Sequence, residues 1–456
     1  MAWAPQFGTS GIRGSVPNEL NPTIAWHIGL SIATFFRRKP LLLGHDNRTS
    51  SPLLAEAMAS GLMAGGSQVL FCGEIITPAV SFYTRHRQLA GAIIITGSHI
   101  PAHMSGIEVL ASDGAPLDRD SEGEIERLIE TKMASLPWRR QGKSISLIDV
   151  GTYWVKKVIQ QVNAKLIAEH NFCVTVDACN GSAIPWLLDA INGLGCKVIG
   201  VNAHSDPFFS GRSPNLRVKL LGNTVKIVKE KKCDLGVAVD GDGDRAFFID
   251  DKGRALMGDV TGTVLACIEL DRRGGGTIVT PINSSNLIED MAKLHKGKVV
   301  YSRIGPPAIV DAVKKHKAIF AFEESGKIIY PQLNYLSDSG LAAARLLEYL
   351  AEQDTSLSQI IDSLPHYQQL KQAIDCPNHL KKSIIEHVLS VASNEYPDAN
   401  LITLDGVKLV FGDGWLLLRP SGTEPVFRCF AEARTRKRAR ELLKQGLDWI
   451  NIVLKS

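Results

Sequence analysis

The chain has 456 residues, 45% of them hydrophobic and 21% charged, which is typical of a folded protein of roughly three or four domains. Its net charge of +4 is too small to favour a nucleic-acid-binding protein, and no apolar run approaches the ~18 residues of a membrane span. The eight cysteines are scattered without a C-x-x-C pair, and the first residues carry no secretory signal pattern. We therefore expect a cytoplasmic protein with no nucleic-acid or membrane partner.

The first distinctive stretch is FGTSGIRG, residues 7–14. Its small residues would let backbone amides approach an anion, and Arg13 could add a bidentate contact, although an ordinary turn explains the pattern equally well. Helical and apolar strand patterns then alternate, as in a layered α/β domain. We expect helices over 23–37, 52–63, 77–86 and 122–132, strands over 41–43 and 69–71, and a further apolar strand that begins at Gly91 and leads to Ser98.

The strand that begins at Gly91 leads directly into Thr96-Gly97-Ser98-His99-Ile100-Pro101. Ligand sites in α/β sheets collect at such strand ends, and a serine placed there can act as a nucleophile when it is activated. A turn serine that caps a helix is the alternative. The G-x-S-x-G elbow is absent, so hydrolase chemistry is less favoured.

A second acidic and glycine-rich loop, Asp240-Gly241-Asp242-Gly243-Asp244-Arg245, lies between apolar runs over 235–239 and 246–249. Three carboxylates this close repel one another unless a cation neutralises them, and ligands that are all oxygens select a hard cation such as Mg²⁺. An EF-hand is excluded, because Arg245 and Asp251 stand where it needs Gly and Glu. A solvated acidic turn remains the alternative.

Two further loops follow expected strands. The strand over 319–322 leads to Glu323-Glu324-Ser325-Gly326-Lys327, whose acceptors and donors suit sugar hydroxyls, although an acidic turn is an equally good interpretation. The strand over 415–418 leads to Arg419-Pro420-Ser421-Gly422-Thr423, which combines a guanidinium, two hydroxyls and open amides. That combination predicts a phosphate-binding loop, with a plain Pro/Gly turn as the alternative.

The remaining patterns divide the chain into four parts, which we place at 1–143, 144–249, 250–361 and 362–456. The second and third repeat the α/β plan, with helices over 153–170, 184–193, 220–231, 260–270, 287–294, 308–315 and 341–352 and strands over 172–176, 197–201, 277–280 and 299–304. The fourth has helices over 383–393 and 436–454 and short strands over 401–404, 407–411, 415–418 and 426–433.

These loops, in this order, resemble the α-D-phosphohexomutase superfamily, which includes phosphomannomutase/phosphoglucomutase and phosphoglucosamine mutase. Residues 96–101 look like its T-A-S-H-N-P phosphoserine loop, with Gly for Ala and Ile for Asn. Residues 240–245 match its D-G-D-x-D-R metal loop, and 322–327 look like its G-E-x-S-G-H sugar loop. Residues 419–425 match its R-x-S-G-T-E-P phosphate loop, and 7–14 are similar to its opening F-G-T-x-G-x-R-G.

The resemblance implies an α/β fold of four domains around a central cleft. Three related α/β domains with mixed sheets would be followed by a C-terminal α+β domain whose sheet is like that of TATA-binding protein. It also implies a reaction, in which a phosphoserine gives its phosphoryl group to a hexose monophosphate. The resulting bisphosphate reorients while bound, and its other phosphate returns to the serine. The implied cofactor is Mg²⁺, the implied activator is a hexose 1,6-bisphosphate, and the implied partners are hexose phosphates, with the protein a monomer or homodimer.

The resemblance also assigns residues by their place in the motifs. The implied catalytic residues are Ser98, His99, Arg13 and Arg245, and the implied metal ligands are Asp240, Asp242, Asp244 and a phosphoryl oxygen on Ser98. The implied sugar-binding residues are Glu323, Ser325 and Lys327, and those for the non-reacting phosphate are Arg419, Ser421, Gly422 and Thr423.

Three positions depart from the family pattern. The family usually follows its serine loop with N-G-x-K, but this chain has Ser105-Gly106-Ile107-Glu108, and it has Pro306 and Lys327 where many members have His. Lys327 could still transfer protons if its pKa is lowered, and Glu108 could act as an acid if its pKa is raised. We therefore expect a mutase for mannose and glucose phosphates. The alternatives are a phosphoglucosamine mutase and a non-catalytic sugar-phosphate-binding homologue.

Overall fold

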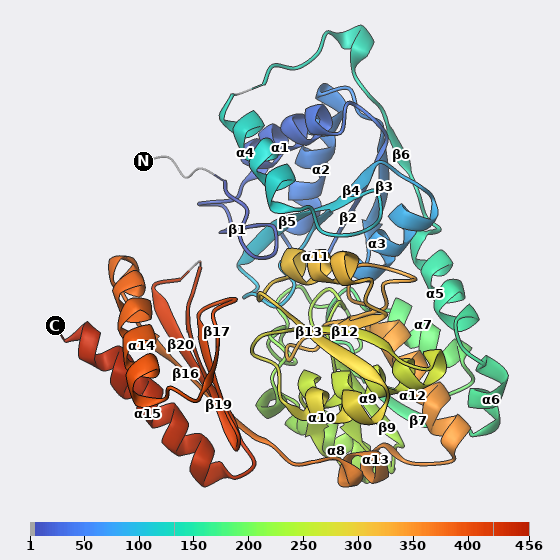
Figure 1. Ribbon diagram of the computed structural model, residues 1–456. Helices are drawn as coiled ribbons and strands as arrows, with labels where there is room; N and C mark the ends of the chain where they lie inside the picture. Colours follow the sequence, from blue (N-terminus) through green and yellow to red (C-terminus); the bar gives the residue numbers. More distant parts are fainter. Residues whose placement is uncertain (1–4, 132, 423, 456) are drawn as a thin grey trace.

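The computed structural model describes residues 5–131, 133–422 and 424–455, which form four sheets. We name the domains I to IV after these sheets in chain order. Domains I to III lie against one another, and domain IV flanks them beside domain III (Figure 1). No helix among the described residues is long and apolar enough to cross a membrane.

Domain I has a six-stranded mixed sheet in the order β1-β5-β4-β2-β3-β6. Strands β2, β3, β4 and β6 run parallel, while β5 turns back antiparallel to β4 and pairs with β1. The first helix begins with Asn21, whose side chain accepts a hydrogen bond from Ile24 N, and Pro22 follows as a favoured first helical residue. The elements are β1 Ile12–Ser15, α1 Pro22–Phe35, β2 Leu41–His45, α2 Ser51–Ala64, β3 Val69–Glu74, α3 Thr77–His86, β4 Gly91–Ile95, β5 Met104–Ala111, α4 Arg119–Glu130 and β6 Ser144–Ser146.

Domains II and III repeat the layered plan with smaller mixed sheets. Domain II has the strand order β11-β10-β9-β7-β8, and domain III has β13-β12-β14-β15. Domain II contains α5 Val150–Gln160, α6 Ala164–Glu169, β7 Cys173–Asp177, α7 Trp186–Gly193, β8 Lys197–Val201, α8 Gly222–Lys231, β9 Leu235–Val239, β10 Ala246–Asp250 and β11 Ala255–Leu256. Domain III contains α9 Gly258–Arg273, β12 Gly276–Pro281, α10 Leu287–Leu294, β13 Gly297–Ser302, α11 Pro306–His316, β14 Phe320–Phe322, β15 Ile328–Ile329, α12 Ser339–Gln353 and α13 Leu357–Ser363.

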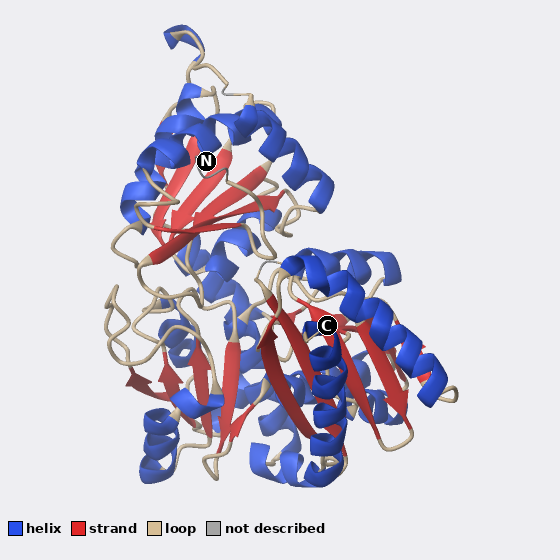
Figure 2. Ribbon diagram, turned by 90° about the vertical axis from the view of Figure 1, so that its left-hand side faces the viewer, coloured by secondary structure: helices blue, strands red, loops and turns tan. Residues whose placement is uncertain are grey.

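Domain IV is a five-stranded antiparallel sheet in the order β16-β20-β19-β18-β17. The side chains of β19 alternate between two buried faces. Leu416 and Leu418 pack under α14 and α15, whereas Trp415 and Leu417 pack against Ile282 of domain III. The two helices therefore cover the outer face of the sheet, as Figure 1 shows, and Figure 2 separates the helices from the strands by colour. The elements are β16 Gln368–Asp375, α14 Lys381–Glu395, β17 Asn400–Ile402, β18 Val407–Phe411, β19 Gly414–Pro420, β20 Val426–Ala433 and α15 Arg436–Leu454.

The predicted fold class, three α/β domains with mixed sheets and a C-terminal α+β domain, is confirmed. Some elements differ from those predicted. The single helix expected over 153–170 is two helices, because Asn163 starts α6 by accepting a hydrogen bond from Leu166 N. Strands β1, β5 and β16 were not predicted. Strand β6 pairs with β3, so the first sheet extends past the expected division at residue 143.

Candidate active site

The serine loop lies between the end of β4 and the start of β5. Ser98 is buried and has a left-handed backbone with φ of 45°, which an L-residue adopts only when its surroundings hold it there. Its Oγ donates a hydrogen bond to Asp240 Oδ2 at 2.9 Å and lies 3.4 Å from His99 Nδ1. The predicted nucleophile therefore touches the predicted metal loop.

A buried arginine that the sequence analysis did not single out holds this loop from behind. Arg48 donates to Ser98 O at 2.9 Å, Ile100 O at 2.7 Å and Pro101 O at 2.5 Å, and its Nε lies 3.0 Å from Asp46 Oδ2. A methyl group at Gly97 would lie 2.1 Å from the guanidinium carbon of Arg48, so the guanidinium fills the space that a side chain would need. The only signal in the sequence was that Arg48 follows an apolar strand.

The three aspartates of the metal loop are fully or almost fully buried, and one oxygen from each lies within 4.8 Å of the others. Asp242 Oδ1 and Asp244 Oδ1 have no hydrogen-bond partner. Burial, followed by the charge of Asp244, raises the pKa of Asp240 to about 7, and burial with both neighbouring carboxylates raises the pKa of Asp242. Buried, unpartnered oxygens in a set that repels itself fit a hard cation such as Mg²⁺.

Two cations lie beside this acidic set. Arg245 Nε is 3.7 Å from carboxylate oxygens of Asp240 and Asp244, and Lys327 Nζ is 2.8 Å from Asp244 Oδ2. Burial is the largest single effect and favours the neutral amine, but the carboxylates of Asp244, Glu108 and Glu323 together outweigh it and raise the pKa of Lys327. The condition under which Lys327 could transfer protons, a lowered pKa, is therefore not met, because the neighbouring carboxylates stabilise the ammonium.

His99 differs from its neighbours in charge. Burial, with the positive charges of Arg245 and Arg13, lowers the pKa of His99 to about 2. The imidazole is therefore neutral at physiological pH, and it can contact an anion through an N–H group but not through a positive charge.

The opening loop reaches the serine loop through Arg13. Arg13 Nε donates to Ser10 O at 2.9 Å, and its two terminal nitrogens contact Thr96 O and the Glu108 carboxylate. Its guanidinium thus lies beside the serine loop but is already engaged on all three nitrogens. Glu108, the acid at the position of the family lysine, is the ion-pair partner of Arg13.

The sugar loop is joined to the metal loop through the backbone. Ala246 N donates to Gly326 O at 3.0 Å, and Ser325 Oγ donates to Glu323 Oε2 at 2.7 Å. Glu323 Oε1 is buried without a partner. Glu323 therefore has a free acceptor beside the metal loop.

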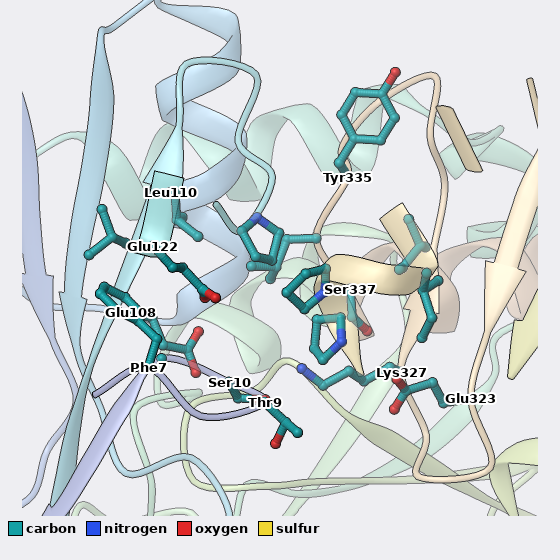
Figure 3. Close-up of a pocket in the computed structure, with 18 residues that line it drawn as sticks. Phe7, Thr9, Ser10, Glu108, Leu110, Glu122, Glu323, Lys327, Tyr335 and Ser337 are labelled. Carbon is teal, nitrogen blue, oxygen red and sulfur yellow. The ribbon is translucent and has the colours of Figure 1, made fainter. Parts of the chain in front are cut away.

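Two cavities adjoin these loops. The larger, of about 680 Å³, is lined by His99, Arg245 and Ser325 and, from domains II and IV, by Arg217, Lys219, Lys371 and Arg428. These last four cations were not predicted. A small pocket between domains I and III has Glu108 and Glu122 on one wall and Glu323 and Lys327 on the other (Figure 3). Pro306 also lines it, and burial raises the pKa of Glu122 to about 7.

The described residues of the phosphate loop, Arg419, Ser421 and Gly422, are not brought to the large cavity. Arg419 is buried at the end of β19 and pairs with Asp405 at 2.9 Å. Ser421 is also buried, and its Oγ accepts from Glu424 N at 3.2 Å, whereas a methyl group at Gly422 would meet open space. Thr423 lies outside the described residues. Among the residues that the structure describes, Arg419, Ser421 and Gly422 do not line the 680 Å³ cavity.

Comparison with known proteins matches the whole chain. Four family models match in order: phosphoglucomutase/phosphomannomutase alpha/beta/alpha domain I at residues 4–135, domain II at 152–253, domain III at 257–367 and the C-terminal domain at 374–447. A phosphoglucomutase/phosphomannomutase of Thermococcus kodakarensis is 35% identical over 98% of this chain and 99% of its own. A phosphoglucosamine/phosphogalactosamine mutase of Sulfurisphaera tokodaii is 34% identical over 96% of this chain and 97% of its own.

Solved structures show the same fold. The crystal structure of a phosphoglucomutase/phosphomannomutase family protein from Burkholderia thailandensis superposes with a TM-score of 0.88 at 23% identity, covering 99% of this chain and 98% of that one. The serine loop, the acidic loop and the four matched domains all indicate the same family. The chain belongs to the phosphoglucomutase/phosphomannomutase family, a family of isomerases within the phosphohexomutase superfamily.

Proposed function

We propose that the protein interconverts the 1-phosphates and 6-phosphates of mannose and glucose through a phosphorylated Ser98. The observation that carries this proposal is the hydrogen bond of 2.9 Å between Ser98 Oγ and Asp240, within a buried set of carboxylates that has unpartnered oxygens. The adjoining cavity of about 680 Å³ lies in the ordinary range for a small-ligand site.

In the proposed reaction the bond between phosphorus and Ser98 Oγ breaks as a sugar hydroxyl oxygen bonds to the same phosphorus. That hydroxyl loses its proton and the leaving Ser98 Oγ takes one up, so that the products are a bisphosphorylated sugar and the free serine hydroxyl. After the sugar reorients in the cavity, its other phosphoryl group returns to Ser98. A Mg²⁺ ion held by Asp240, Asp242, Asp244 and a phosphoryl oxygen would withdraw the negative charge that develops. A hexose 1,6-bisphosphate would act as activator by phosphorylating Ser98.

The protein's own groups divide the remaining work. Arg245 and Lys327, both held charged by the acidic loop, would stabilise the transferring phosphoryl group, and neutral His99 would contribute an N–H donor. Arg13 would keep the serine loop in place from beneath. Glu323 and Ser325 would hold the sugar hydroxyls, and the free Oε1 of Glu323 supports that role.

The non-reacting phosphate would bind Arg419, Ser421, Gly422 and Thr423. Because the first three do not line the cavity, binding would require domain IV to move toward the serine loop. We also expect the enzyme to act in the cytoplasm as a monomer or homodimer.

A second candidate is a phosphoglucosamine mutase, which is favoured by the 34% identity to the Sulfurisphaera relative. A non-catalytic sugar-phosphate-binding protein is less well supported, because the contact between Ser98 and the acidic loop is intact.

The test is a phosphoryl transfer experiment. Protein incubated with Mg²⁺ and glucose 1,6-bisphosphate carrying ³²P in both phosphates should become labelled on Ser98, and mannose 6-phosphate or glucose 6-phosphate should remove the label as bisphosphate. A parallel chase with glucosamine 6-phosphate tests the second candidate, because a phosphoglucosamine mutase should lose its label faster with this sugar than with the mannose or glucose phosphate. Ser98→Ala should abolish labelling. Ser105→Ala, which removes a buried hydroxyl without a partner, should not. Absence of label on folded parent protein, or label that no sugar phosphate removes, would refute the proposal.

A further inference from the structure

Asp405 connects the phosphate loop to domain III through one carboxylate oxygen. Its Oδ2 accepts a hydrogen bond from Ile304 N, in the connection between β13 and α11, at 2.9 Å. The same oxygen lies 2.9 Å from Nε of Arg419 in domain IV. The carboxylate thus contacts two domains and the arginine expected to bind phosphate.

The turn that carries Asp405 is fixed on both sides. Arg303 Nε donates to Leu404 O at 3.1 Å, so a second contact to domain III precedes Asp405. Gly406 follows with φ of 88°, and a methyl group there would lie 2.3 Å from Leu418 O, beside Arg419. Only glycine fits this approach, so the turn is pressed against the strand that carries Arg419.

The contact leaves the terminal nitrogens of Arg419 available. A guanidinium held at Nε keeps a planar pair of Nη groups, which is the geometry that binds phosphate through two parallel hydrogen bonds. No hydrogen bond among the described residues uses a guanidinium nitrogen of Arg419, because the contact of Nε with Asp405 Oδ2 is an ion pair in which the Nε–H does not point at the oxygen. The carboxylate therefore holds the guanidinium close by charge and leaves its N–H groups free for a phosphate.

We propose that Asp405 is a positioning residue for substrate phosphate: its negative charge, 2.9 Å from Nε, holds the Arg419 guanidinium in place. This inference rests on the proposed function and names a residue that acts through Arg419. Loss of that charge would leave the Arg419 side chain to sample other rotamers, whereas an asparagine oxygen could still accept the hydrogen bond from Ile304 N. Phosphate affinity would fall, while the chemistry at Ser98 would continue.

Other contacts should keep domain IV docked without Asp405. Lys408 Nζ donates to Ile282 O at 2.8 Å, and Asn286 N donates to Glu432 Oε1 at 2.8 Å, both between domains III and IV. The Trp415 and Leu417 face also packs on domain III. A variant at Asp405 is therefore expected to fold.

The experiment compares Asp405→Asn with Asp405→Glu and Asp413→Asn. Asp413 also pairs with an arginine of domain IV, Arg438 at 2.8 Å, but it is exposed, and among the described residues its carboxylate has hydrogen bonds and an ion pair with Arg438 alone. With glucose 1-phosphate, Asp405→Asn should raise KM about tenfold and leave kcat within about twofold, as expected for losing one largely buried opposite charge beside Arg419. Asp405→Glu should recover most of the KM, and Asp413→Asn should match the parent.

The opposite result for KM would overturn the inference. If Asp405 instead competes with phosphate for Arg419, Asp405→Asn would lower KM, and an unchanged KM would mean that Arg419 needs no orientation. A binding experiment separates the role of Asp405 from the proposed function. Glucose 6-phosphate and orthophosphate are titrated by calorimetry into two proteins that carry Ser98→Ala, one with Asp405 and one with Asp405→Asn. Binding by a parent that shows no turnover would refute the function, and the affinity of Asp405→Asn would still decide the inference. Failure of the parent to bind either probe would refute both.

Discussion

Asp242 is the aspartate of the metal loop without a cation partner, and this makes Asp242→Asn the most informative substitution. Arg245 lies near Asp240 and Asp244, and Lys327 pairs with Asp244 at 2.8 Å, whereas no ion pair among the described residues involves Asp242. Asparagine keeps the shape, can still accept from the Thr77 hydroxyl as Oδ2 does at 2.6 Å, and removes one buried charge.

The expected change in the free energy of unfolding follows from the spacing of the carboxylates. Two unit charges at the outer limit of 4.8 Å repel by about 3.5 kcal/mol at an effective dielectric constant of ~20, and Asp242 has two such neighbours. Attraction to nearby guanidinium groups offsets part of this. We therefore expect Asp242→Asn to raise the free energy of unfolding of the metal-free protein by about 1–3 kcal/mol.

Asp244→Asn is the matched control, for which we expect the free energy of unfolding to fall. It also removes one charge, but it leaves the buried ammonium of Lys327 without its partner at 2.8 Å. Removing one partner of a buried ion pair lowers the free energy of unfolding by about 3–5 kcal/mol. The weaker repulsion among the remaining carboxylates of the metal loop offsets part of this loss. We expect this variant to unfold about 2 kcal/mol more easily than the parent.

Urea denaturation in EDTA measures both variants. Because burial and then the neighbouring carboxylates raise the pKa of Asp242, its neutral form is favoured on folding. This contribution to stability is present at low pH and is lost as the pH rises above the usual aspartate range, so the gain in Asp242→Asn should be larger at pH 8 than at pH 5. Added Mg²⁺ should stabilise the parent and neither variant. Two variants shifted in the same direction, or an unchanged Mg²⁺ response, would refute the reasoning.

Three further predictions concern groups outside the metal loop. Arg48→Lys should cut ³²P labelling of Ser98 more than tenfold in protein that remains folded by circular dichroism, because a lysine cannot reach three carbonyl oxygens at once; full labelling would contradict this. Glu108→Gln should leave the pH profile of turnover unchanged, since Glu108 pairs with Arg13, and a lost limb in the profile would show proton transfer instead. Burial lowers the pKa of Lys408 to about 8, so unfolding free energy should rise between about pH 8 and 10 relative to Lys408→Met, and parallel profiles would count against it.

Elements with a clear apolar pattern were predictable from the sequence. The helix Thr77–His86 has the predicted bounds. The strand Gly91–Ile95 lies where an apolar strand was predicted ahead of Ser98, because buried parallel strands are continuous apolar runs. Strand β16, Gln368–Asp375, was not predicted, because most of its side chains are polar and exposed and its place in the sheet depends on pairing with β20. Pairing partners far apart in the chain leave no local signal.

The site was predictable where residues follow strands and not where they act across domains. Ser98 and Asp240 are 142 positions apart, yet each follows the end of a buried strand, and the structure brings them to 2.9 Å. Arg48 was missed because it binds carbonyl oxygens of the loop, which no side-chain pattern reports. The distance of Arg419 from the cavity was also unpredictable, because it depends on how domain IV packs on domain III.

The most direct test of the account is turnover by the purified protein. Mannose 1-phosphate, glucose 1-phosphate and glucosamine 6-phosphate are assayed separately with Mg²⁺ and a trace of glucose 1,6-bisphosphate, beside Ser98→Ala. The account predicts isomerisation of the mannose and glucose phosphates that disappears in Ser98→Ala. Silence on all three sugars from folded protein with phosphorylated Ser98, or equal turnover by Ser98→Ala, would contradict it.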